Sequence, residues 1–181
     1  MPLFTLRFPA DEIAAWAARY DASIDAEVEG EVGPFMRREG YLTRDHFLTL
    51  ARWKSPRPGP LCARNEPGFV ETVTRAAVAT TDERFRIEVL RLLQGVDWPT
   101  ASAILHLGST EPYPLLDVRA LWSLGHDTKP PYTFDLWWAY TTFTRGLAEA
   151  QGVSMRTLDR ALWKFSEDHQ GRLTPAAVPA P

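Results

Sequence analysis

Cysteine, long apolar segments and known catalytic signatures are scarce or missing in this 181-residue sequence. Its one cysteine, Cys62, cannot form a disulfide within the chain. No apolar run approaches the roughly 18 residues that a membrane-spanning helix needs, and the first residues lead into a charged segment rather than a secretion signal. We therefore expect a cytoplasmic protein that does not insert into membranes.

The missing signatures exclude several enzyme classes. The sequence has no H-E-x-x-H, P-loop or G-x-S-x-G pattern, and its histidines do not cluster with its cysteine. Nothing therefore supports a metalloprotease, a P-loop nucleotide hydrolase or a serine hydrolase, and no metal ligand is predicted.

Positive charge is in slight deficit overall and is unevenly distributed along the chain. The formal net charge is −3, which disfavours high-affinity, nonspecific binding of nucleic acid. Residues 11–31 carry seven acidic side chains and one arginine, for a net charge of −6. Residues 37–64 carry seven basic and two acidic side chains, for a net charge of +5. This asymmetry predicts a basic face on an acidic protein.

Hydrophobic periodicity predicts an all-α protein. The chain is 45% hydrophobic and 12% aromatic, which indicates a globular protein, and no strand-like alternation persists. We expect residues 1–171 to form one helical domain, followed by a Pro/Ala-rich tail at residues 172–181. Caps and breaks divide the chain into about eight helices. They are expected at residues 11–20, 43–54, 66–79, 82–93, 100–107, 118–124, 134–150 and 154–169.

The same periodicity predicts which side chains face the core. Phe69 in the third helix, and Phe85 and Leu92 in the fourth, are expected to face inward. Residues 21–41, interrupted by glycine and proline, are expected to be irregular or only briefly helical. The arginines expected to be largely exposed are Arg84, Arg86 and Arg91.

A tight turn at residues 94–98 separates the fourth and fifth expected helices. Gly95 can adopt the positive φ of a sharp reversal, and Pro99 suits the first turn of the next helix. The small residues from Thr100 onward let a ligand approach, and the exposed helix amides favour an anion. The turn is either such a binding hairpin or an ordinary corner of an all-α core.

Asp117 opens the sixth expected helix. The two prolines in the preceding loop restrict how its carboxylate is presented, and an aspartate here is a natural N-cap for residues 118–124. Capping and catalysis are both open to it, because a catalytic carboxylate can also serve as a cap.

A basic and aromatic cluster lies at residues 52–57. Trp53, Lys54 and Arg57 come at the end of the second expected helix, where a proline-rich loop begins. An aromatic ring flanked by cations suits base stacking and phosphate binding. Alternatively, Trp53 packs on the core and the cations are solvated.

The centre of the chain resembles a known family. Residues 93–101, Leu-Gln-Gly-Val-Asp-Trp-Pro-Thr-Ala, resemble the hairpin of helix-hairpin-helix DNA glycosylases of the endonuclease III superfamily, also called HhH-GPD. Residues 114–122, Pro-Leu-Leu-Asp-Val-Arg-Ala-Leu-Trp, are similar to the following segment, which carries the catalytic aspartate of that family. The resemblance covers about residues 82–125. It implies an HhH-GPD fold of about eight helices in two lobes.

The resemblance also implies roles for individual residues. Asp117 would be the catalytic carboxylate of a DNA repair glycosylase that excises a damaged or modified base from double-stranded DNA. Arg119 would contact a phosphate or pair with a neighbour. Hairpin carbonyls could hold a monovalent cation, and no other cofactor is required. The predicted DNA-binding residues are Gly95, Val96, Asp97, Thr100, Arg119, Trp53, Lys54 and Arg57.

Three departures from the family pattern refine this hypothesis. Pro99 replaces the lysine nucleophile of bifunctional members, so we expect a monofunctional enzyme that leaves an abasic site. We also expect a monomer. The single cysteine excludes the four-cysteine iron–sulfur cluster of some members. Asp97 replaces the second hairpin glycine and brings a negative charge toward the expected phosphate. That charge favours the alternatives, a noncatalytic DNA-binding or adaptor protein on the same fold or a helical protein–protein module.

Overall fold

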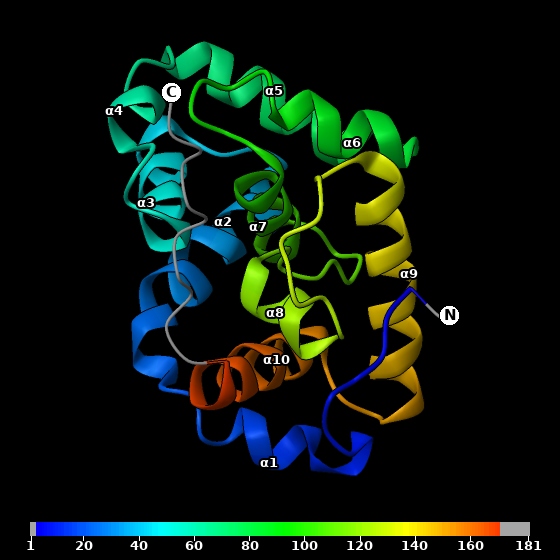
Figure 1. Ribbon diagram of the computed structural model, residues 1–181. Coiled ribbons are helices and arrows are strands. Elements are labelled where there is room, and N and C mark those ends of the chain that lie inside the picture. The colour runs from blue at the N-terminus through cyan, green and yellow to red at the C-terminus, as the bar shows by residue number, and fades with distance from the viewer. Residues whose placement is uncertain (1–2, 171–181) are drawn as a thin grey trace, which may run out of the picture.

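Every regular element in the computed structural model, which describes residues 3–170, is a helix (Figure 1). The all-α prediction is thereby confirmed for that range, and the predicted tail lies outside it. The single-domain and two-lobe predictions stay predictions. In chain order the elements are η1 (Ala10–Glu12), α1 (Ile13–Ala17), η2 (Ala22–Asp25), the π-helix η3 (Val28–Val32), α2 (Gly33–Glu39), α3 (Arg44–Lys54), α4 (Gly59–Cys62), α5 (Pro67–Ala79), α6 (Glu83–Leu90), α7 (Trp98–Gly108), α8 (Val118–Ser123), α9 (Phe134–Ala150) and α10 (Met155–His169).

Side-chain caps set the start of several helices where they were predicted. In each case the side-chain oxygen of the cap accepts a hydrogen bond from a backbone amide of the first turn, which would otherwise have no partner. Gly152, with φ +61°, follows the end of α9 at Ala150. The predicted capping residues found here are Thr43, Asp117, Thr133 and Ser154. The cap of α6 is Asp82, whereas the sequence predicts a capping box from Thr80 to Glu83.

Helix α7 lies at the centre of the molecule and contacts α2, α3, α6 and η3 (Figure 1). A second group of contacts surrounds α10, which packs on α1, α8 and α9. Residues 21–41 are more helical than expected, because Gly33 begins α2 instead of ending a helix. A Cβ at Gly33 would lie 2.9 Å from the carbonyl oxygen of Leu107 in α7, so glycine permits this close approach.

The burial predicted for the fourth helix is wrong at three positions. Phe85 and Leu92 are exposed, whereas Arg86 is buried. Ile87 and Leu90 lie on the face of α6 that packs inward, Phe85 lies outside that face, and Leu92 lies in the turn that follows the end of the helix at Leu90. Arg86 remains buried because its guanidinium donates a hydrogen bond to the carbonyl oxygen of Thr80 and lies 3.7 Å from Glu83.

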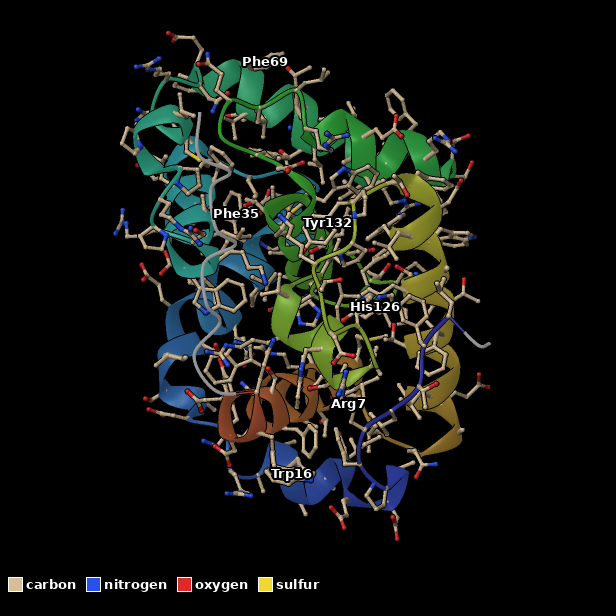
Figure 2. The ribbon with its side chains drawn as sticks, in the orientation of Figure 1. Arg7, Trp16, Phe35, Phe69, His126 and Tyr132 are labelled. Carbon is tan, nitrogen blue, oxygen red and sulfur yellow. The ribbon has the colours of Figure 1, made fainter. Side chains whose placement is uncertain are left out.

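Phe69 is a second correction. It was expected in the core but is 44% exposed and lies on the outer side of α5 (Figure 2). The inward face of α5 is formed by Val70, Val73 and Ala77, at spacings of three and four residues. Phe69 falls one position outside that stripe. No helix within residues 3–170 is long and apolar enough to cross a membrane.

Candidate active site

An ion pair between Lys54 and Asp117 forms the centre of the candidate site. Lys54 is the last residue of α3, and its Nζ lies 3.1 Å from Oδ2 of Asp117. The other carboxylate oxygen, Oδ1, caps α8 by accepting a hydrogen bond from the amide of Ala120 at 2.8 Å. The side chains of Lys54 and Asp117 are 10% and 23% exposed. The cap therefore fixes the carboxylate while leaving one edge of it accessible.

A cavity of about 320 Å³ opens on one side of this pair. Three aromatic side chains, Tyr20, Trp53 and Trp163, contribute to its walls, and Tyr20 meets Trp163 edge to face at 5.4 Å between ring centroids. This volume and mixed lining are typical of small-molecule sites. The remaining lining residues are Ile24, Lys54, Leu115, Asp117, Ala120, Arg156, Asp159 and Arg160.

A groove of about 500 Å³ opens on the other side of the pair. Lys54, Asp117 and Trp163 line both the cavity and the groove, and thus form the boundary between them. Tyr132 lies near the centre of the molecule on the groove wall (Figure 2). The hairpin contributes Gly95, Asp97, Pro99 and Thr100, and the cations that line the groove are Lys54, Arg57, Arg119 and Lys129.

The hairpin is held by α4 and by Asn65, three residues after the end of that helix. Gly95 has φ +80°, as predicted, and a Cβ there would lie 2.6 Å from Sγ of Cys62. Asn65, which is buried, accepts a hydrogen bond from the amide of Gln94 at 2.8 Å and donates one to its carbonyl oxygen at 2.9 Å. The amide of Val96 is used within the turn, where it donates to the carbonyl oxygen of Leu93.

Asp97 has an extended backbone conformation at the start of α7. Its φ is −121°, so the position is extended and needs no glycine. Its carboxylate lies 3.3 Å from Nε of Arg91, and that guanidinium lies 4.6 Å from the ring centroid of Trp98. The negative charge at the hairpin is therefore paired within the protein.

A buried cluster of charges supports the far wall of the cavity. Asp25 is completely buried and accepts hydrogen bonds from the hydroxyl of Tyr20 and the indole nitrogen of Trp53, both at 3.1 Å. Arg156 and Arg160 contact its second carboxylate oxygen at 2.5 and 2.9 Å. Burial, and then the charge of Asp25, raises the pKa of Tyr20 to about 12. Tyr20 therefore remains a neutral hydrogen-bond donor.

A second buried carboxyl, Asp159, also lines the cavity. Its Oδ1 accepts a hydrogen bond from the amide of Leu115, and its Oδ2 accepts none within residues 3–170. Burial raises the pKa of Asp159 well above its usual range. Burial also lowers the pKa of His106 to about 3, and its Nδ1, 3.1 Å from Asp159, donates to the carbonyl oxygen of Tyr113. His106 is therefore neutral near pH 7.

The predicted site residues converge only in part. Trp53 lines the cavity and Arg57 lines the groove, whereas the side chain of Val96 is buried beneath the hairpin. Arg119 lies 5.2 Å from the ring centroid of Trp163, and one terminal nitrogen of its guanidinium is buried without an acceptor in the described part of the chain. Gly95, Asp97, Thr100, Lys54 and Asp117 meet at the groove.

Sequence reasoning missed the contribution of α10. Arg156, Arg160 and Trp163 follow one another at intervals of four and three residues, so they share one face of the helix and reach the cavity together. Helical spacing of these three side chains was the signal that could have revealed them. Lys129 and Tyr132, in the loop before α9, carried no comparable pattern.

Comparison of the chain with models of protein families, with curated proteins and with solved structures finds no match.

Proposed function

We propose that this protein is a DNA N-glycosylase that hydrolyses the bond between a damaged or modified base and its sugar. One observation carries the proposal: the Asp117 carboxylate lies at the boundary between an aromatic-walled cavity and a groove lined by four cations. An extruded base would enter the cavity while the strand backbone stays in the groove. The bond to be broken would then lie beside Asp117.

Asp117 would act on the sugar. As the base leaves, the sugar gains positive charge, which an ionised carboxylate stabilises at short range. The same carboxylate can orient or deprotonate the attacking water. Its cap on α8 keeps it in place during the reaction, because the bond from Ala120 uses the oxygen that does not face Lys54.

The groove would bind the DNA backbone. Arg57, Arg119 and Lys129 supply positive charge around the hairpin, and the pairing of Asp97 with Arg91 reduces repulsion of a phosphate. Trp53 and Tyr20 offer faces for stacking on the extruded base. A monovalent cation held by hairpin carbonyls remains part of the proposal, as does an HhH-GPD arrangement of the helices.

A noncatalytic DNA-binding or adaptor protein is the second candidate. The observation that favours it is the ion pair itself, since both oxygens of Asp117 already have partners, Lys54 and the amide of Ala120. On this alternative the groove binds duplex DNA, while the carboxylate serves only to cap α8 and hold α3.

An excision assay tests the proposal. The protein is incubated with duplexes that carry a panel of damaged or modified bases, and alkali then breaks any abasic site. We expect excision of at least one base and its loss in Asp117→Asn. The matched control is Asp135→Asn, because Asp135 is 90% exposed at the start of α9. Salt-sensitive duplex binding without excision would favour the adaptor, and excision by a folded Asp117→Asn would contradict the role of the carboxylate.

A further inference from the structure

The cations of this chain are nearly all arginines. Arginine outnumbers lysine 17 to 3, and only Lys54, Lys129 and Lys164 carry an amine on their side chain. Lys129 is exposed, and Lys164 pairs with Glu167 and Asp168 on the surface of α10. Among the described residues, Lys54 is therefore the one lysine in a largely enclosed site, and its side chain is 10% exposed.

The choice of lysine at position 54 matters chemically. A guanidinium could pair with Asp117 or a phosphate equally well, but it does not lose its proton in proteins. An amine can lose its proton and attack carbon, and lysine forms imines with carbonyl compounds. The Asp117 carboxylate, 3.1 Å away, is in hydrogen-bond reach to take that proton.

Lys54 also reaches the place where the sugar would lie. It lines both the cavity and the groove, as Asp117 does, and it approaches from α3, whereas Asp117 approaches from the start of α8. A sugar whose base has entered the cavity and whose phosphates lie in the groove would contact both side chains.

We propose that Lys54 gives the protein a second activity, cleavage of the DNA strand at an abasic site through an imine between its Nζ and C1′ of the sugar. This inference rests on the proposed function, because that function places the sugar beside Asp117. The expectation of a monofunctional enzyme considered only position 99 of the hairpin. The amine of Lys54 comes from α3, which is not part of the hairpin motif.

The reaction begins with imine formation. The Lys54 ammonium gives a proton to the Asp117 carboxylate, and the free amine attacks the aldehyde carbon C1′ of the ring-opened abasic sugar. A proton moves from nitrogen to oxygen, and the resulting hydroxyl leaves as water with the proton held by Asp117. A protonated imine and an ionised Asp117 remain, so the charge is unchanged.

Strand cleavage follows by β-elimination. Asp117 or a water removes a proton from C2′, a double bond forms between C2′ and C3′, and the bond from C3′ to the phosphate oxygen breaks with its electron pair on the phosphate. Water then hydrolyses the imine, which releases an unsaturated aldehyde and restores the Lys54 amine. No oxidant or reductant takes part.

Reductive trapping on a preformed abasic site tests the inference. A duplex with one abasic site is incubated with the full chain and sodium cyanoborohydride, which reduces the imine to a stable amine. We expect a covalent protein–DNA complex with the wild type and its loss in Lys54→Arg, which keeps a cation beside Asp117. Lys164→Arg, outside both the cavity and the groove, is the control and should retain the complex. Mass spectrometry of the wild-type complex should place the DNA on Lys54.

The outcomes separate the two proposals. No complex with the wild type, a complex that persists in Lys54→Arg, or a cross-link on another amine would each overturn the role of Lys54. The mapping uses the wild type, so a Lys54→Arg protein that fails to fold cannot hide the answer. Excision in the base panel without trapping would leave the glycosylase and remove the lyase. Trapping at Lys54 without excision of any base would support the lyase and contradict the glycosylase.

Discussion

Asp25 and Asp117 are two carboxylates that meet cations from distant parts of the chain, but their surroundings differ. Asp25 is completely buried. Its two carboxylate oxygens are contacted by four side chains: Tyr20, Trp53 from α3, and Arg156 and Arg160 from α10. Asp117 accepts one backbone hydrogen bond and pairs with one lysine, and open space lies on two sides of it.

The comparison separates a carboxylate that holds the fold from one that can act on a substrate. A buried charge is tolerated only when partners replace the lost water, and the partners of Asp25 leave no room for a ligand. Asp117 is held by its cap but keeps an accessible edge. The first group therefore builds the cavity wall, and the second provides the chemistry we propose.

The largest effect on stability is expected from Asp25→Asn. Removing this buried charge leaves Arg156 and Arg160, whose side chains are 17% and 21% exposed, with Glu29 as their one carboxylate partner among the described ion pairs, and breaking a buried ion pair costs about 3–5 kcal/mol. Chemical denaturation should show that loss. Asp117→Asn should lower the free energy of unfolding by less than Asp25→Asn does, because asparagine is also a good N-cap and only one ion pair, with Lys54, is lost. A greater loss from Asp117→Asn than from Asp25→Asn would reverse the comparison.

The hairpin beside the accessible edge of Asp117 should depend on Gly95 for its stability. Alanine at this position would adopt an unfavourable positive φ, and its Cβ would collide with Cys62, so Gly95→Ala should cost at least about 1–3 kcal/mol. The control is Gly152→Ala, which has a similar φ of +61° but no atom within 4 Å of the added Cβ. Thermal unfolding should rank Gly95→Ala as clearly worse, and equal losses would show that the contact with Cys62 is unimportant.

His106, behind the cavity floor, should make stability depend on pH. Its native pKa is lowered to about 3, whereas an unfolded histidine titrates near its ordinary value of 6.5. Between these values the unfolded chain holds a proton that the native state lacks, so the native state loses about 1.4 kcal/mol per pH unit as the pH falls.

The variant His106→Asn isolates that contribution. Subtracting their unfolding free energies removes the contributions of titrating groups that do not contact His106. The wild type should therefore lose stability relative to His106→Asn on going from pH 6.5 to pH 5. A constant difference over that range would mean that His106 is already protonated in the native state.

The smallest effect is expected at the groove. Arg119→Ala should weaken duplex binding uniformly across sequences and reduce the slope of log affinity against log salt by about 1, as expected for loss of one phosphate contact. Arg84→Ala is the matched control, since Arg84 is exposed on α6 and pairs with Glu88 and Asp135. Fluorescence anisotropy over a series of salt concentrations measures both slopes, and identical slopes would remove Arg119 from the interface.

Features that depend on near neighbours in the chain could be predicted from the sequence. The bounds of α9, the start of α10 and the positive φ of Gly95 follow from caps and glycine conformation within a few residues. The capping role of Asp117 belongs to the same group. Local hydrogen bonds and steric limits determine these features, and neither requires knowledge of the rest of the fold.

Only the tertiary structure decided which distant side chains meet. Periodicity predicted that Phe85 and Leu92 face inward, but the buried face of α6 contains Ile87 and Leu90, and Leu92 lies beyond the end of the helix. Helix packing likewise brings Lys54 to Asp117 across 63 positions of sequence. Such a pairing depends on how helices cross, which no local pattern encodes. The sequence by itself thus determined the helices and the capped carboxylate, and packing decided which amine and which cavity lie beside it.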